Sequence, residues 1–176
     1  MSMNQLENRL KTLDHEEAFI FDKNGKLVSA YTGGESEVSI PAWEFLRKDA
    51  TITHGHPVDK NNYGGTLSPA DVMNIADSSI GQMRAVAQGQ GEYKYIVRRT
   101  SKADGKGLKS KINRDLGWLE KTAKEEAKNT KRRVYKKTGS KASASHAAEQ
   151  AYKGVYDWYW KDTLPQFGFD YVKRKK

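Results

Sequence analysis

The stretch TITHGHPVDKNNYGGTLSPADV, residues 51–72, predicts how a strand is joined to a helix in this chain. Its first residues, Thr51–Thr53, are typical of a short buried strand, which we expect to end at His54. Pro57 then turns the chain away, because proline cannot donate to a strand ladder. Asp, Asn and Gly fill much of residues 57–67, and these residue types favour a loop.

A helix start follows this loop. Ser68 is a favourable N-cap, because its hydroxyl can accept from a backbone N–H of the first turn. Pro69 suits the first helical position, where no backbone N–H is needed. Asp71 brings a carboxylate to the first turn, and Val72 and Ile75 begin an apolar stripe. The sequence therefore predicts a capped, amphipathic helix from residue 69.

The residues on either side predict a mixed α/β fold. We expect a helix over 3–13, a hairpin of strands over 18–21 and 26–31, further strands over 37–40, 83–87 and 93–97, and a helical turn over 41–47. Asn24-Gly25 between two apolar runs indicates the hairpin. In the helical turn, Trp43 and either Phe45 or Leu46 are expected to face the core. This order predicts a mixed, twisted sheet of about five or six strands flanked by helices.

The positive charge is concentrated in one segment. The chain of 176 residues has 31 Lys and Arg against 22 Asp and Glu, a net charge of +9. Residues 1–101 hold 11 basic and 13 acidic residues, for −2, and residues 102–141 hold 14 and 5, for +9. Residues 142–176 hold 6 and 4, for +2. This shift predicts two parts, a domain over 1–100 and a basic helical extension over 101–176.

Apolar residues at helical spacing organise the extension. We expect a long basic helix from Leu108 to about Lys137, a break of small residues over 139–145, a second helix over 145–162 that Leu164-Pro165 ends, and a basic tail over 171–176. The aromatic residues of the second helix surround it, so some of them must be buried against the rest of the protein.

The long helix carries a candidate nucleic-acid interface. Clustered Lys and Arg give sequence-independent affinity for phosphates, and no acidic residue falls between Asn129 and Lys141. The candidate contacts are Lys131, Arg132, Arg133, Lys136 and Lys137. The alternative is a solvated helix face, in which Glu120, Glu125 and Glu126 pair with nearby lysines. The first half of the helix favours this alternative, and the second half favours binding of DNA.

Composition excludes several classes of protein. The chain has no cysteine, which excludes a disulfide scaffold, a thiolate metal site and a cysteine nucleophile. No run approaches the roughly 18 apolar residues of a membrane span, and the N-terminus lacks the apolar core of a signal peptide. We therefore expect a soluble protein that does not contact membranes.

Two histidines and a carboxylate predict a metal site. His54 and His56 are two residues apart on an extended chain, so their imidazoles point to one face and can share a metal ion. Asp71, at the start of the next helix, is a candidate third ligand, which leaves a fourth position for water. The hydroxyl of Ser68 lies on the same side of the first turn and could donate to a developing oxyanion.

A hydrolytic site also needs a general base near the water. Glu16 and Glu17, at the start of the first strand, are the candidates upstream of the histidines. The competing interpretation is that Ser-Pro-x-Asp is only a helix cap and that His-x-His is a chance pair. The succession of both motifs across one loop favours the metal site.

The two motifs together resemble a known family. Thr53–Pro57 followed by Leu67–Val72 is similar to the JAB/MPN (JAMM) metalloprotease signature, which is an upstream Glu, then His-x-His, then Ser-x-x-Asp. The resemblance extends from Glu16–Gly25 to about Val97, and so covers the domain over 1–100. The Pro after the second His and the acidic first strand resemble the JAB-like domains of phage head and minor structural proteins in particular.

The resemblance implies a fold, an activity and a site. It implies a JAB/MPN-like zinc-dependent hydrolase of peptide or isopeptide bonds, encoded by a phage or prophage and located in the host cytoplasm or the virion. Zinc would be held by His54, His56 and Asp71, with Ser68 stabilising the oxyanion and Glu16 polarising the zinc-bound water. Between Glu16 and Glu17, the spacing to the following Asp favours Glu16.

The resemblance also leaves an alternative function. The loop before Ser68 is longer than in the eukaryotic deubiquitinating members, and its insertion over 61–65 could be a substrate loop or could move the helix start away from the metal. The JAB fold also serves as an inactive scaffold. The alternative is therefore a non-enzymatic phage structural or ejected protein that binds DNA through its basic C-terminal helices.

Overall fold

The structure is a computed structural model that describes residues 1–35, 37–57, 65–88 and 93–175. In chain order its elements are α1 (Met3–Leu10), β1 (Glu17–Phe21), β2 (Leu27–Thr32), the 3-10 helix η1 (Ala42–Leu46), β3 (Thr51–His56), α2 (Pro69–Ala76), β4 (Gln82–Ala87), β5 (Tyr93–Arg99), α3 (Gly105–Thr138), α4 (Lys141–Gln166) and β6 (Phe169–Lys175). The strands form one sheet in the order β2-β1-β3-β4-β5-β6, in which only the β3–β4 pair is parallel. The fold is therefore mixed α/β, as the sequence predicts.

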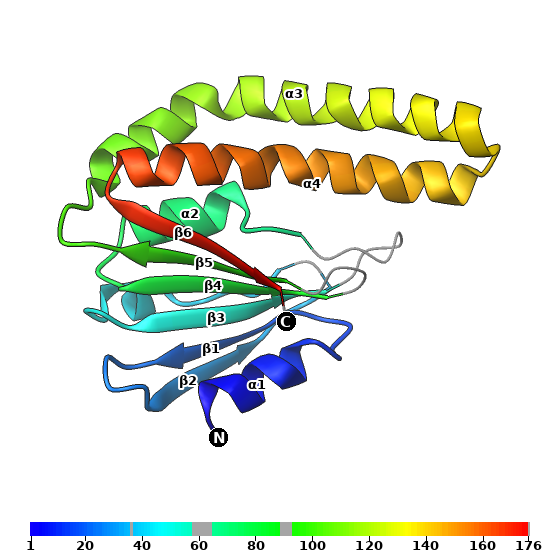
Figure 1. The fold of residues 1–176 in the computed structure, drawn as a ribbon. Coiled ribbons are helices and arrows are strands. Elements are labelled where there is room, and N and C mark those ends of the chain that lie inside the picture. Colours follow the sequence, from blue (N-terminus) through cyan, green and yellow to red (C-terminus); the bar gives the residue numbers. More distant parts are fainter. Residues whose placement is uncertain (36, 58–64, 89–92, 176) are drawn as a thin grey trace.

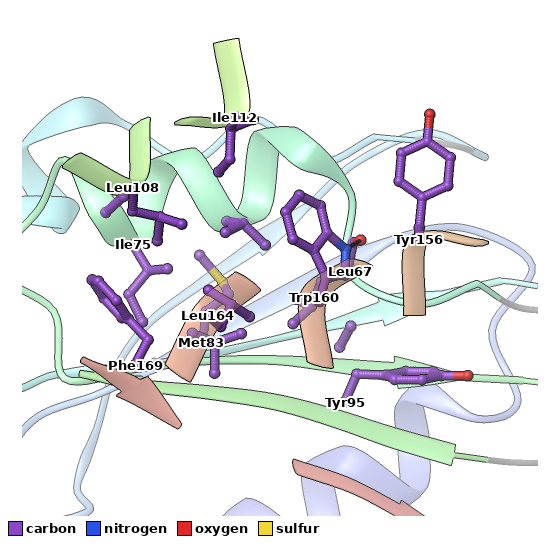
Figure 2. Close-up of a cluster of buried hydrophobic side chains, with 14 of the residues drawn as sticks. Leu67, Ile75, Met83, Tyr95, Leu108, Ile112, Tyr156, Trp160, Leu164 and Phe169 are labelled. Atoms are coloured by element: carbon purple, nitrogen blue, oxygen red, sulfur yellow. Dashed lines mark hydrogen bonds between the residues drawn. The ribbon is translucent and has the colours of Figure 1, made fainter. Parts of the chain in front are cut away.

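Helices cover both faces of the sheet. On one face, Leu6 and Leu10 of α1 pack with Phe19, Phe21 and Val86. On the other face, α2, α3 and α4 share a larger hydrophobic cluster with the sheet. Figure 2 shows this cluster, in which side chains of the three helices gather beside Met83 and Tyr95. In Figure 1, α3 and α4 run side by side and their connected ends reach past the ends of the strands.

The C-terminal part of the chain shares this core with the predicted domain over 1–100. Trp160 of α4 is fully buried, and its Nε1 donates to the backbone oxygen of Leu67 at 2.8 Å. After α4, β6 pairs with β5 along its whole length, and Phe169 at its start is buried. The expected basic tail is therefore wrong as far as residue 175. Apolar Phe169 provides an anchor in the core, and the lysines that follow suit an exposed edge strand.

The long helices begin and end at local signals. The Asp104 side chain accepts from the Gly107 N–H at 2.9 Å at the start of α3, and Gly139, at a left-handed φ of 67°, ends it. The Ser140 side chain then accepts from the Ser143 N–H at 3.2 Å and starts α4 at once. The predicted break over 139–145 is therefore too long. In the part of the chain that the structure describes, no helix is long and apolar enough to cross a membrane.

Two expectations near residue 40 are wrong. Residues 37–40 form no strand, and Trp43 and Leu46 of η1 are mostly exposed, while Phe45 packs against the core. The buried side chain of this turn is Glu44, which accepts from the Tyr31 hydroxyl at 2.7 Å and pairs with Arg47. A carboxylate can be buried there because its oxygens are satisfied by these partners.

Candidate metal centre

The central strand and the first turn of α2 position the candidate ligands. β3 lies between β1 and β4, and its last residues carry His54 and His56 on one face. At the start of α2, the Ser68 side chain accepts from the Asp71 N–H at 3.2 Å, and the Ser68 N–H donates to Asp71 Oδ2 at 2.8 Å. The predicted cap is confirmed. The cap and the metal site are compatible, because the cap itself orients the Asp71 carboxylate toward the histidines.

The three candidate ligands converge on one point. His54 Nε2 lies 2.9 Å from His56 Nε2 and 3.2 Å from Asp71 Oδ1, and His56 Nε2 lies 3.6 Å from Asp71 Oδ2. Ligand atoms at 2.0–2.2 Å from one tetrahedral zinc ion are about 3.3–3.6 Å from each other. The observed spacing is close to this, so His54, His56 and Asp71 could hold a metal ion.

The tautomers of the histidines also suit a cation. His56 Nδ1 lies 3.0 Å from the Gly65 backbone oxygen, so it carries a proton and leaves the lone pair on Nε2. His54 Nε2 lies 2.9 Å from that atom, a separation that requires either a proton or a cation between the two nitrogens. His54 Nδ1 is buried with no hydrogen-bond partner among the described residues. The donor set therefore fits a metal ion bound through the two Nε2 atoms.

Burial and charge shift the acid–base properties of the site. Burial raises the pKa of Asp71, but the imidazoles of His54 and His56 outweigh burial and hold that pKa well below its ordinary value. The pKa of Glu16 is raised, chiefly by burial, although the same imidazoles partly oppose the shift. A carboxylate that remains ionised can serve as a ligand, and one with a raised pKa is suited to proton transfer.

Glu16 and Glu17 lie on opposite faces of the sheet. Glu16 lines the same cavity as His54, His56 and Asp71. Glu17 lies on the α1 face of the sheet, where its Oε1 accepts from Arg9 Nη2 at 2.7 Å. Of the two candidate bases, only Glu16 is brought to the histidines. Glu16 directly precedes β1, and neighbouring residues of an extended chain point to opposite faces.

The site opens into a cavity of about 860 Å³. One wall consists of apolar residues from the segment before β3, among them Val38, Ile40 and Phe45. The other wall comes from α4 and includes Tyr152 and Tyr156. The sequence indicated only that some aromatic residues of this helix are buried. No local signal could have revealed that two of them face the candidate ligands.

Glu120 of α3 fixes the side chains of Tyr152 and Tyr156, which line the cavity, by hydrogen bonds. Its Oε2 accepts from the hydroxyls of Tyr152 at 2.7 Å and Tyr156 at 2.6 Å. These two hydrogen bonds, with that of Lys124, lower the pKa of Glu120 to about 2. Because both phenolic protons are used in this way, the tyrosines present their rings, rather than hydroxyl donors, to the cavity.

The predicted nucleic-acid contacts lie apart from this site. Lys131, Arg132, Arg133, Lys136 and Lys137 are all exposed near the C-terminal end of α3. Within the described chain, none of the five makes an ion pair. The first half of α3 differs, because Lys111 pairs with Asp115 and Lys124 with Glu120. The predicted insertion over 61–65 lies outside the described residues, apart from Gly65.

Comparison with known proteins adds no relative. No family model matches the chain, and searches of curated proteins and of solved structures find no significant match. The fold and the site therefore define the class by themselves, a mixed α/β protein with a candidate His-His-Asp metal centre.

Proposed function

We propose that the chain is a JAB/MPN-like, zinc-dependent hydrolase of peptide or isopeptide bonds. The observation that carries this proposal is the convergence of three ligand atoms, from His54, His56 and Asp71, in a cavity that Glu16 also lines. Two imidazoles and one carboxylate are a donor set of catalytic zinc sites and leave one position for water.

A bound zinc ion and Glu16 would have different roles in hydrolysis. When bound, a zinc ion would supply a Lewis acid and a water that ionises near neutral pH. Glu16 would accept the proton given up by a water in this cavity and would pass that proton to the amine released from the carbonyl carbon. The raised pKa of Glu16 suits it to both transfers.

Ser68 and the residues that line the cavity would contact the substrate. The Ser68 hydroxyl donates to Asp71 Oδ2 at 2.8 Å, and a rotation about its C–O bond would let it donate to the oxyanion instead. An extended peptide would lie between the tyrosines of α4 and the apolar segment before β3. The walls favour apolar substrate residues next to the cleaved bond.

Metal content is the first test. Elemental mass spectrometry of the purified chain should find about one zinc per chain, and the His54→Ala/His56→Ala variant should lose it. Circular dichroism of both proteins separates loss of metal from loss of fold. Equal zinc in the two proteins would refute the site. If zinc is bound, a library of quenched fluorescent peptides tests for hydrolysis.

We propose DNA binding as a second function, compatible with the first. Residues 127–148 contain seven Lys and Arg and no Asp or Glu, and this segment forms the connected ends of α3 and α4. Fixed positive charge without internal partners favours binding of a polyanion. The attraction would be independent of DNA sequence, because exposed lysines and arginines contact phosphates rather than base edges.

The salt dependence of binding tests this second function. Affinity for a labelled DNA duplex should fall steeply between low and physiological salt, and Lys131→Gln/Arg132→Gln/Arg133→Gln should remove most of it. A matched control is Lys102→Gln/Lys106→Gln/Lys161→Gln, which removes the same charge at exposed positions elsewhere. A flat salt response, or an equal loss in the control, would refute the proposal.

A further inference from the structure

The face of the sheet that α1 partly covers carries a second cavity, away from the metal centre. It measures about 260 Å³ and lies between α1 and the ends of β5 and β6. Five of the residues that line it are cationic, namely Lys11, Arg84, Lys94, Arg174 and Lys175, but the side chain of Lys175, opposite Tyr93, belongs to the other face of the sheet. Lys11 directly follows α1 and the others come from three strands, so the tertiary structure alone brings them together.

Strand register forces two of these charges against each other. In the antiparallel β5–β6 pair, Lys94 lies directly opposite Arg174, and like charges in such a position repel. The register partner of Lys94 on β4 is Val86, which packs with Leu10 of α1. This contact identifies the face on which Lys94 and Arg174 lie.

One buried carboxylate compensates only part of this charge. Glu7 of α1 is fully buried, and its Oε1 accepts from Arg84 Nε at 2.6 Å and from Thr53 Oγ1 at 3.3 Å. Its Oε2 is in contact with Lys94 Nζ. Both oxygens of Glu7 are therefore occupied. Glu7 offsets one of the four positive charges of Lys11, Arg84, Lys94 and Arg174, and no carboxylate is among the described residues that line the cavity.

The remaining cations of the lining make no ion pair with Glu7. Lys11, Arg174 and Lys175 make no ion pair with any residue that the structure describes. The nearest acidic residue along β6 is Asp170, which lies opposite Arg98. Asp170 is four residues from Arg174, about 13 Å along a strand. It is too far away to neutralise the cavity.

We propose that this cavity binds a phosphoryl group. Guanidinium and ammonium groups that converge in a concave site match the several oxygens and double charge of a phosphoryl group better than a single carboxylate. The cavity holds one such group, with Arg84 and Lys94 at its floor and Lys11 and Arg174 at its rim. The group belongs either to a soluble phosphate compound or to a nucleic-acid backbone. The site does not depend on the proposed hydrolase activity.

Pyrophosphate is the probe for the site, measured by titration calorimetry at low ionic strength. The test variant is Lys11→Gln/Arg174→Gln, which removes two cations that do not contact Glu7 and so spares the buried network. The matched control is Lys131→Gln/Arg132→Gln, which removes the same charge from the end of α3. All three proteins keep the metal centre intact, so any binding there is common to them.

The parent chain should bind pyrophosphate, and the test variant should bind it at least about tenfold more weakly. The control should stay within about twofold of the parent. No binding by the parent, or a loss in the control as large as that in the test variant, would overturn the proposal.

Competition with DNA identifies the source of the phosphoryl group. If pyrophosphate displaces a labelled duplex and the test variant binds that duplex more weakly, the group is part of a nucleic-acid backbone. If pyrophosphate binds without displacing the duplex, the group belongs to a soluble phosphate compound. Either result supports a phosphoryl-binding site in this cavity.

Discussion

The sequence predicts both the metal centre and the basic end of α3. In the structure, hydrogen bonds hold side chains of the metal centre in place, whereas the basic side chains of α3 are exposed. His56 and Asp71 are each held by a further hydrogen bond, to the Gly65 backbone and within the α2 cap. The five basic side chains over 131–137 are exposed and unpaired within the described chain. Coordination requires ligand atoms within a few tenths of an ångström, whereas attraction to phosphates needs only charge.

This contrast predicts different responses to substitution. At the metal centre, one change should abolish a discrete event, either binding of a metal or turnover. At the end of α3, each change should remove a similar small share of a graded attraction.

Substitution of Glu16, but not of the neighbouring Glu17, should give the largest effect. Glu16→Gln should keep zinc but lower turnover by a factor of about 10²–10⁴, because an amide cannot accept the proton of the water. Glu17→Gln is the matched control, and should leave turnover nearly unchanged because Glu17 faces α1. Steady-state kinetics on a cleaved peptide measures both. Equal losses in the two variants would contradict the assignment of Glu16.

Two tryptophans of α4 test whether the C-terminal part belongs to the core. Trp160→Ala should lower the free energy of unfolding by about 3–5 kcal/mol, because it empties a buried site and leaves the Leu67 oxygen without its donor. Trp158→Ala removes a mostly exposed ring and should cost about 0.5 kcal/mol or less. Urea unfolding compares them. A similar small cost for both would mean that α4 is an independent appendage.

Protonation of Glu7 at acid pH should lower the free energy of unfolding. Burial raises the pKa of Glu7, but hydrogen bonds from Arg84 and Lys94 outweigh burial and keep the pKa below its ordinary value of 4.5. The stabilisation is complete above pH 4.5, where Glu7 is ionised in both states, and is lost as the pH falls through the lower folded value.

The variant Glu7→Gln should therefore flatten the acid side of the stability profile. Urea midpoints between about pH 5 and 3 measure the slope. The exposed Glu125→Gln serves as the control and should keep the slope of the parent chain. An unchanged slope in Glu7→Gln would show that other groups cause the acid sensitivity.

The smallest effect on the fold is expected at the end of α3. Lys131→Gln/Arg132→Gln/Arg133→Gln should change the free energy of unfolding by less than about 0.5 kcal/mol, because these side chains are exposed. The same variant should reduce the slope of log affinity for DNA against log salt by about three. An unchanged slope would indicate that other cations of the chain contact the DNA.

Local sequence signals determined much of this protein. The cap at Ser68 and Asp71, the turn at Asn24-Gly25 and the ends of α3 are specified by residues a few positions apart, and the structure agrees with each of them. His54 and His56 share a face because of the strand repeat alone. Such features can be read from a sequence because each depends on near neighbours.

Tertiary structure alone decided the rest. Whether Glu16 or Glu17 meets the histidines depends on which face of β1 turns toward α2, and the entry of Phe169 into the sheet depends on the exposed edge of β5. The tyrosines of α4 face the metal centre because Trp160 anchors that helix beside Leu67. These contacts join residues tens of positions apart. The period of a helix or strand shows which residues share a face, but not which partner that face meets.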